Sequence, residues 1–185
     1  EEAFRPAMVE RSTRHVRTLR NHASIIIWSA GNESGNGENF KYVMEAIENL
    51  DPTRLTHYEG NSTWSTVTST MYGSLDHMMN IARPRLEDYK QGKKGIRPHV
   101  QCENTHAMGN SCGDVADYWD LIYNNEQLMG AFVWEWADHG IKTEKGFLYG
   151  GDFGETEHDG NFCIDGLLTP DRKLKSGAVE MKAVY

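Results

Sequence analysis

The chain has 185 residues, of which 38% are hydrophobic, so it is long enough to bury one sizeable core. Its formal net charge of -8 argues against nucleic acids and anionic membranes as partners, because both are themselves negatively charged. A mean hydropathy of -0.64 and the lack of a long apolar run argue against a membrane-spanning helix.

The first ten residues, EEAFRPAMVE, contain neither the basic nor the apolar region of a secretory signal peptide. They also lack an initiator Met and begin as if inside a helix, so we expect a piece of a longer chain. A cytoplasmic location is the expectation, and a periplasmic or secreted parent stays open because its leader would lie upstream. Cys102, Cys112 and Cys163 show no CxxC spacing, so we expect free thiols and no zinc site.

The first part of the chain alternates between helix and strand patterns. Glu1–Arg20 is charged and helix-prone, and the apolar run Ile25–Ser29 that follows is typical of a buried parallel strand. Glu38–Asn49 carries apolar residues at helical spacing and ends before Asp-Pro. Leu55–Glu59 is then the next predicted strand.

This alternation breaks before the next predicted strand, Thr66–Tyr72. The gap after Glu59 is too short for a helical crossover, which needs about a dozen residues. Asp76–Gly95 has apolar residues spaced for one amphipathic helix and its exit loop, with Ile81, Leu86 and Tyr89 on the apolar side.

The second half of the chain repeats the pattern and then leaves it. We expect a strand over His99–Cys102, a helix over Val115–Leu128 and a strongly strand-like run over Gly130–Trp136. Lys142–Asp171 is Gly-rich and predicts a long excursion with short strand pieces. Ser176–Tyr185 predicts a short helical or extended tail.

Two of the predicted strands deliver a glutamate at their ends. Glu33 follows the first strand in SIIIWSAGNESGNG, and Glu103 follows the strand in RPHVQCENTHAMGN. Glycoside hydrolysis needs two carboxyl groups, one protonated to serve the leaving oxygen and one ionised to attack or to activate water. An acidic residue after a strand often only opens a loop, and the chain has 27 acidic residues. The pair of glutamates indicates catalysis only because each of them follows a strand-like run. Glu59 also ends a strand-like run and competes for such a role.

Several segments together resemble the central domain of glycoside hydrolase family 2, in particular that of the large bacterial β-galactosidases. These segments, in chain order, are RNHASIIIWSAGNESGNG, DPTRLTHYEG, MYGSLD, VQCENTHAMGNS, GAFVWEWADHG and YGGDFGETEHDGNFCIDGLL. The resemblance covers essentially the whole chain. It implies a retaining glycoside hydrolase that releases terminal non-reducing β-D-galactose from β-galactosides such as lactose.

The resemblance also assigns roles to residues at the strand ends. Glu33 corresponds to the general acid/base and Glu103 to the nucleophile, and Asn32 would hydrogen-bond the sugar 2-hydroxyl group. Retention requires the two carboxyl groups to lie about 5–5.5 Å apart. Glu59 has no catalytic counterpart, so we expect it to support the site through hydrogen bonds or a charge pair.

Three further residues are expected to contact the nucleophile or the sugar. By resemblance, the Tyr72 hydroxyl bonds to the nucleophile, His106 contacts the sugar and Trp134 forms the floor of the sugar site. The alternatives are a solvent-facing rim tyrosine, a structural histidine and a core tryptophan. Cys102, next to Glu103 on a strand, points to the opposite face and is expected to pack as a small hydrophobe.

The family uses Mg2+ and Na+. Glu33 corresponds to one Mg2+ ligand, but the other ligands lie upstream in the family, so we expect little Mg2+ binding by this piece alone. The Na+ site corresponds to the Phe162 carbonyl and the Asp165 side chain, where the best-known members have Asn. Asn104 stands where the family usually has Tyr, and Asn36 stands where it can have His. These two differences bear on the preference for the acceptor sugar more than on catalysis.

The resemblance implies an α/β fold, a distorted TIM (β/α)8 barrel, of which the five predicted strands correspond to strands four to eight. Residues 1–185 would then form a single partial domain, the C-terminal portion of the barrel, with the loop excursion over its mouth. An open sheet edge would need a partner. The expected partners are the missing N-terminal part of the barrel, the other domains of the parent chain and, for the parent, further copies in a homo-oligomer.

Other functions remain open at this point. The piece can be inactive alone, or it can belong to a related family 2 enzyme, a β-glucuronidase or a β-mannosidase. The motifs HAMGN and GGDFG favour a galactosidase. A carbohydrate-binding module would suit exposed Trp134 and Trp64, but it has no need for two strand-end glutamates in these motifs.

Overall fold

The computed structural model describes residues 2–60 and 62–185, which form two compact units. The first unit contains the described residues up to Thr70 together with Asp88–Val100, and the second contains Met71–Glu87 and Gln101–Tyr185. The boundary therefore passes through strands β3 (Thr68–Met71) and β4 (His99–Asn104) and near the end of helix α3 (Leu75–Lys90).

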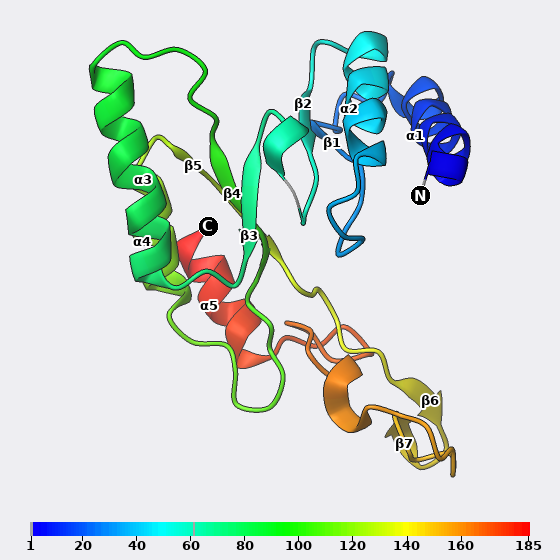
Figure 1. The fold of residues 1–185 in the computed structure, drawn as a ribbon. Helices are drawn as coiled ribbons and strands as arrows, with labels where there is room; N and C mark the ends of the chain where they lie inside the picture. Colours follow the sequence, from blue (N-terminus) through cyan, green and yellow to red (C-terminus); the bar gives the residue numbers. More distant parts are fainter. Residues whose placement is uncertain (1, 61) are drawn as a thin grey trace. The chain divides into compact units, whose positions relative to one another are not determined.

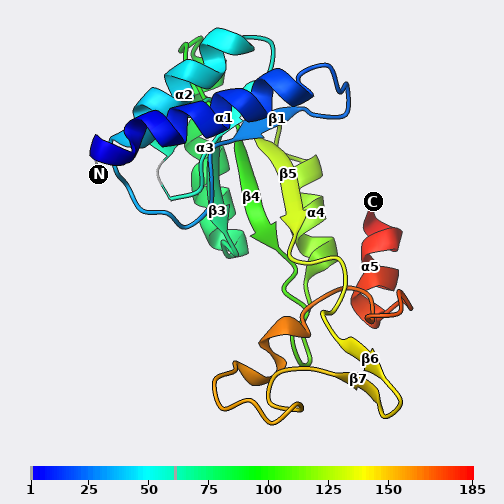
Figure 2. The ribbon, with the colours of Figure 1, turned by 90° about the vertical axis from the view of Figure 1, so that its right-hand side faces the viewer.

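The first unit begins with two helices and two short parallel strands (Figures 1 and 2). Its elements are η1 (Glu2–Phe4), α1 (Arg5–Leu19), β1 (Ile27–Ser29), α2 (Asn39–Leu50), β2 (Leu55–His57) and η2 (Ser62–Trp64). Ile27 of β1 pairs with Leu55 of β2, and α2 forms the crossover between the two parallel strands. This is the β-α-β unit that the sequence predicts.

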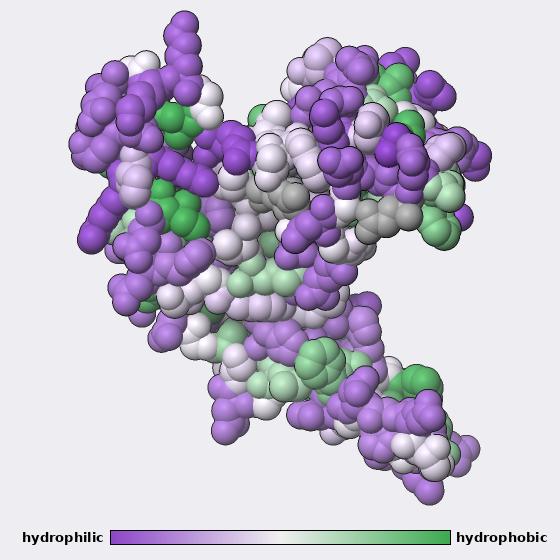
Figure 3. Space-filling model, viewed as in Figure 1, coloured by the Kyte–Doolittle hydropathy of each residue, from purple (hydrophilic) through white to green (hydrophobic). Residues whose placement is uncertain are grey.

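The core of the first unit lies between its helices and β1. Val16 of α1, Trp28 of β1 and Ile47 of α2 belong to one buried cluster, each no more than 2% exposed. The amphipathic spacing of α1 and α2 thus directs one face of each helix toward β1. Their visible outer surfaces are mostly hydrophilic, as expected for helices that cover a core (Figure 3).

The second unit contains most of the remaining elements. These are most of α3, then α4 (Val115–Tyr123), β5 (Leu128–Val133), β6 (Ile141–Thr143), β7 (Gly146–Leu148), η3 (Gly160–Cys163) and α5 (Ser176–Val184). β6 and β7 pair as an antiparallel hairpin. The predicted excursion therefore contains a hairpin and a 3-10 turn, and the predicted tail is a helix.

Two apolar clusters hold the second unit together. Met78 and Ala82 of α3 meet Ile122 of α4 and Leu128 of β5. The other cluster joins α5 to α4 and to the segments after β4 and β5, with Ala107, Val115, Ala137, Leu167, Leu168, Ala178 and Met181 as its buried members. Helices α3 and α4 thus lie together beside β5 (Figures 1 and 2).

Strands β3, β4 and β5 form a three-stranded sheet in that order. The Thr68 N–H donates to the Pro98 carbonyl at 3.0 Å, and the Tyr72 N–H donates to the Glu103 carbonyl at 2.9 Å. Donors and acceptors both advance along the chain, which is the pattern of parallel strands. The Trp134 N–H donates to the Asn104 carbonyl at 2.7 Å, so the carboxyl ends of all three strands lie side by side.

Several predicted boundaries differ from the structure. The first strand starts at Ile27, because Ile26 is 66% exposed and takes no part in the pairing. β4 extends to Asn104, so Glu103 lies within the strand near its end. The helix predicted to reach Leu128 ends at Tyr123, and Leu128 begins β5.

The face of α3 also differs from the prediction. Tyr89, expected on the apolar side, is 59% exposed, whereas Met78 and Ala82 are fully buried. The five predicted strands are present as β1 to β5, but in the described part of the chain they form a two-stranded and a three-stranded sheet without closing a barrel. No helix in this part is both long and apolar enough to cross a membrane.

Asp51 joins α2 to β1 and β2 through a buried hydrogen-bond network. Its carboxylate accepts hydrogen bonds from the Thr53 hydroxyl at 2.5 Å and the Trp28 Nε1 at 2.9 Å, and from the Arg54 guanidinium at 2.5 Å. These donors hold the pKa of Asp51 well below its usual range. The residue that ends the helix therefore also anchors the core tryptophan.

We expect Asp51→Asn to lower the urea midpoint of unfolding at neutral pH, because Asn carries no charge for Arg54 and one acceptor oxygen fewer. The lowered folded-state pKa gives stability that is present above the ordinary pKa of 3.8 and is lost as the pH falls below it. The difference between variant and wild type should therefore shrink below about pH 4. Circular dichroism measures both midpoints, with exposed Asp117→Asn as the control. A difference that is independent of pH would contradict this interpretation.

Candidate active site

Glu103 is held by Tyr72 through two hydrogen bonds. The Tyr72 hydroxyl donates to Glu103 Oε2 at 2.7 Å, and the Tyr72 N–H donates to the Glu103 carbonyl at 2.9 Å. Burial and then the bond to Glu103 raise the pKa of Tyr72 above its usual value. The phenol thus keeps its proton at neutral pH and fixes the orientation of the carboxylate. The structure contains the hydrogen bond that the resemblance implies.

His106 lies next to this pair and connects it to Asp165. Its ring meets that of Tyr72 edge-on, with centroids 5.9 Å apart, and lies 5.6 Å from the ring of Phe162. His106 Nε2 is 3.2 Å from Asp165 Oδ2. Asp165 is only 2% exposed, and its Oδ1 atom has no hydrogen-bond partner among the described residues.

Trp134 stands at the end of β5 with 42% of its surface exposed. Together with Glu135, Phe162 and Asp165 it lines a pocket of about 300 Å³. Exposed aromatic rings pack well on the C–H face of a sugar, and buried carboxylates bind hydroxyl groups. The pocket thus offers one apolar wall and several polar groups, which is the composition of a small-molecule site.

Glu135 is a further candidate for a functional residue in this pocket, and the sequence did not indicate it. Its Oε2 atom is 2.9 Å from His139 Nε2, and Asp165 is the acidic side chain next to it in the pocket. Burial and then Asp165 raise the pKa of Glu135 above its usual value. No local pattern in the sequence indicated an acidic neighbour 30 residues further on.

The first unit contains Asn32 and Glu33, in a turn after β1. Both side chains are exposed, and Glu33 has a left-handed backbone with φ of 47°. Such a conformation costs a non-glycine residue about 1–2 kcal/mol, so other contacts must hold it. The Glu33 N–H donates to Glu59 Oε2 at 2.8 Å, which is the kind of support expected of Glu59.

The predicted site residues therefore divide between the units. Unit two brings together Tyr72, Glu103, His106, Trp134, Phe162 and Asp165, whereas unit one contains Asn32 and Glu33. The separation of the Glu33 and Glu103 carboxyl groups stays a prediction. Over residues 2–60 and 62–185, no three His, Cys, Asp or Glu side chains cluster as metal ligands.

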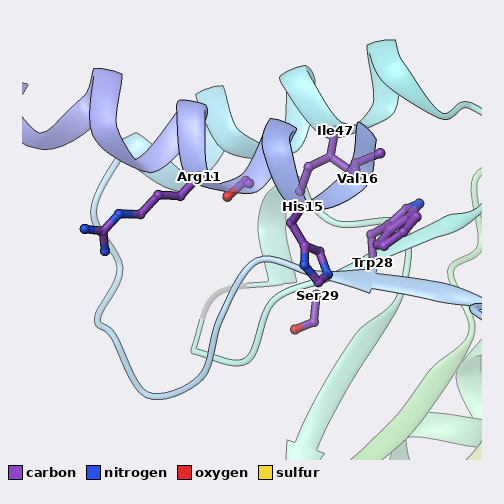
Figure 4. Close-up of a pocket in the computed structure, with 7 residues that line it drawn as sticks. Arg11, His15, Val16, Trp28, Ser29 and Ile47 are labelled. Carbon is purple, nitrogen blue, oxygen red and sulfur yellow. The ribbon is translucent and has the colours of Figure 1, made fainter. Parts of the chain in front are cut away.

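A separate pocket of about 260 Å³ lies between α1 and β1 (Figure 4). His15 projects from α1 toward β1, and its ring meets Trp28 edge-on at 5.5 Å. Arg11 and Ser29 also line this pocket, but none of the predicted site residues does. We therefore do not assign it to the candidate active site.

Comparison with known proteins gives one family. Residues 1–185 match the model of the glycosyl hydrolases family 2, TIM barrel domain. The chain is 43% identical over 183 residues to a β-galactosidase of Actinobacillus pleuropneumoniae, covering 98% of this chain and 18% of that protein. It is 40% identical over 193 residues to a β-galactosidase of Kluyveromyces lactis, covering 98% and 18%. The chain thus spans about a fifth of the length of these curated relatives.

Solved structures share the fold at lower sequence identity. A Ruminococcus gnavus β-glucuronidase matches with a TM-score of 0.60 and 20% identity, covering 97% of this chain and 34% of that one. A β-galacturonidase from Eisenbergiella tayi matches with a TM-score of 0.61 and 14% identity, covering 98% and 37%.

We expect the Glu103→Gln variant to lower the pKa of Tyr72 toward, but not to, that of a free tyrosine. The variant removes the negative charge and the strong acceptor that oppose ionisation, whereas burial of the hydroxyl, the larger cause, remains. Tyrosinate absorbance measures this titration, and the Tyr72→Phe variant identifies the signal of Tyr72. A Tyr72 titration unchanged in Glu103→Gln would show that the two side chains do not interact.

Proposed function

The chain belongs to glycoside hydrolase family 2, and we propose that it forms part of the catalytic domain of a retaining β-galactosidase. The observation that carries this proposal is the Glu103 carboxylate, held by a phenol 2.7 Å away at the carboxyl end of a parallel sheet. Identity of 40–43% to proteins that are β-galactosidases supports galactose as the sugar. The likeness to uronidases lies at 14–20% identity and therefore supports the fold alone.

The proposed reaction has two displacements. In the first, Glu103 attacks the anomeric carbon and forms an ester bond, while the bond to the leaving oxygen breaks and Glu33 gives that oxygen its proton. In the second, the Glu33 carboxylate takes a proton from water, whose oxygen attacks the anomeric carbon and releases Glu103. Configuration at the anomeric carbon is retained because it is inverted twice.

The neighbouring residues have positioning and binding roles in this proposal. Tyr72 aligns the Glu103 carboxylate for attack along a single line. Trp134 supplies an aromatic face for the sugar ring, and His106, fixed by Asp165, contacts the sugar hydroxyl groups. Asn32, beside Glu33, hydrogen-bonds the 2-hydroxyl group, where such bonds strengthen as the transition state forms.

We propose that strands β1 to β5 are strands four to eight of a distorted (β/α)8 barrel. The parallel pairing and the helical crossovers support this assignment. Within the described residues β1 pairs only with β2, and β5 is the last strand of its sheet, so each has an edge at which further strands of a longer chain can pair. The isolated piece is then expected to be inactive without them.

The family's cations are part of the proposal only where this chain offers ligands. The buried Asp165 Oδ1 has no hydrogen-bond partner in the described part of the chain, so a spare oxygen suited to Na+ exists beside Phe162. Na+ there would offset the negative charge of Asp165 and bind sugar oxygens. For Mg2+, Glu33 supplies a single carboxylate, and the remaining ligands must come from elsewhere in a longer chain.

We test the reaction in the full-length chain, meaning the longer protein proposed to contain these residues. There we expect Glu103→Gln to lower kcat on an aryl β-galactoside by more than about 10³-fold, because an amide cannot form the glycosyl ester. Sugar binding, measured by calorimetry, should persist. A 2-fluoro galactosyl substrate with a good leaving group should label wild type at Glu103, as seen by mass spectrometry of peptides. Labelling at another residue, or an inverted product by NMR, would contradict the proposed reaction.

We expect Na+, compared with choline at equal ionic strength, to raise the unfolding temperature of the full-length chain. Binding to the native state stabilises by mass action, and Asp165→Ala should abolish the difference. Glu157→Ala, an exposed acidic position in the same long loop, is the matched control. An equal Na+ effect in wild type and Asp165→Ala would remove Asp165 from the proposed site.

A further inference from the structure

The turn that presents Glu33 requires a positive φ at Glu33 itself. Gly31, Glu33 and Gly35 have φ of 154°, 47° and 78°, and no helix or strand includes them. Glycine adopts positive φ freely, but Glu33 in the middle of the turn does not. Something outside the turn must therefore hold Glu33 in place.

Two consecutive residues after β2 contact this turn on both sides of the Glu33 side chain. Glu59 Oε2 accepts a hydrogen bond from the Glu33 N–H at 2.8 Å. The Tyr58 hydroxyl donates to the Gly35 carbonyl at 2.5 Å. The turn is thus fixed before and after the Glu33 side chain, and all four residues belong to the first unit.

Tyr58 is suited to anchor the turn because it is buried and its ring is stacked. It is 0% exposed, and its ring stacks on that of Phe40 with centroids 3.8 Å apart and an 18° angle between the planes. The backbone of Gly31 packs directly on the Tyr58 ring, where an added Cβ would come to 3.5 Å. Phe40 is in the first turn of α2, so the anchor is tied to the helix that follows the turn.

The backbone continues the parallel ladder up to this point. The Ala30 N–H donates to the His57 carbonyl at 2.9 Å, and the Glu59 N–H approaches the Gly31 carbonyl at 3.4 Å. Glu59 therefore leaves β2 beside the turn, and its side chain is half-buried. Its position is set by the register of β1 and β2, in which Ser29 lies opposite His57.

We propose that Glu59 and Tyr58 are positioning residues that set the direction in which Glu33 projects, an inference that rests on Glu33 being the general acid/base. Glu59 fixes the Glu33 backbone nitrogen, which is bonded to the Cα atom that bears the side chain. Tyr58 fixes the far end of the turn, so the Glu33 Cα cannot swing away. Neither residue touches the substrate or the reacting atoms in this assignment.

A displaced acid has a distinctive kinetic effect. A sugar leaving group, as in lactose, needs a proton from the acid, whereas a dinitrophenolate leaves without one. The ratio kcat/KM reports the first displacement. We therefore expect kcat/KM to fall only for the substrate whose leaving group is a sugar. A structural defect that merely reduces the folded fraction lowers kcat/KM for both substrates equally, so the ratio between substrates separates the two effects.

The test compares kcat/KM for lactose and for dinitrophenyl β-galactoside in the full-length chain. For Glu59→Ala we expect kcat/KM for lactose to fall by about 10- to 100-fold, as for loss of a hydrogen bond to a charged group. We expect kcat/KM for the aryl substrate to change less than about 3-fold. Glu59→Gln keeps an acceptor oxygen and should restore most of the lactose activity. Tyr58→Phe keeps the stacked ring but loses the hydroxyl donor, and it should lower kcat/KM for lactose by about 3- to 10-fold.

Exposed Glu45→Ala, on α2 of the same unit, is the matched control and should leave the ratio unchanged. An equal fall for both substrates in Glu59→Ala and Tyr58→Phe, or no fall, would overturn the inference. Should Glu59→Ala fail to fold, the same decision is made with Tyr58→Phe alone. Glu33→Ala is measured in parallel: if it shows no leaving-group dependence, the proposed role of Glu33 fails, and if it shows one that Glu59→Ala and Tyr58→Phe lack, only this inference fails.

Discussion

The candidate site depends on the register between β3 and β4. In a parallel ladder each residue has one fixed neighbour, and here Tyr72 and Glu103 are joined by a backbone bond of 2.9 Å and a side-chain bond of 2.7 Å. A slip of one residue would turn one of the two side chains to the opposite face of the sheet. The pairing of β3 with β4 therefore determines which side chain faces the Glu103 carboxylate.

Backbone strain in the non-glycine residues is concentrated near the proposed chemistry. Of the five described non-glycine residues with positive φ, Tyr72 and Thr105 directly follow β3 and β4, and Glu33 lies in the turn after β1. Such conformations persist when the surrounding structure over-determines them, and they are common at functional sites. In each case the left-handed backbone lies outside the strand itself, in the segment that follows it. The strands supply the rigidity, and the turns aim the side chains.

The sequence predicted the elements better than their contacts. Apolar runs and helical spacing located β1 to β5, because burial of a short strand and of one helix face leaves a local periodic pattern. Boundaries were less accurate where tertiary contacts decide them, as at exposed Ile26 before β1. The proximity of Glu135 to Asp165 was not predicted, since no local pattern connects a strand end to a loop 30 residues later. Glu103 was located by its motif, and its partner Tyr72 by family resemblance.

The two proposed catalytic glutamates are held in different ways, and the difference matches what each must do. Glu103 is fixed through its carboxylate, which accepts the bond from Tyr72, because a nucleophile must approach one carbon along one line. Glu33 is fixed through its backbone N–H, and its side chain is exposed. A group that serves first the leaving oxygen and then a water needs a fixed origin and a carboxyl group that can reorient between two partners. One residue is therefore restrained at its tip and the other at its base.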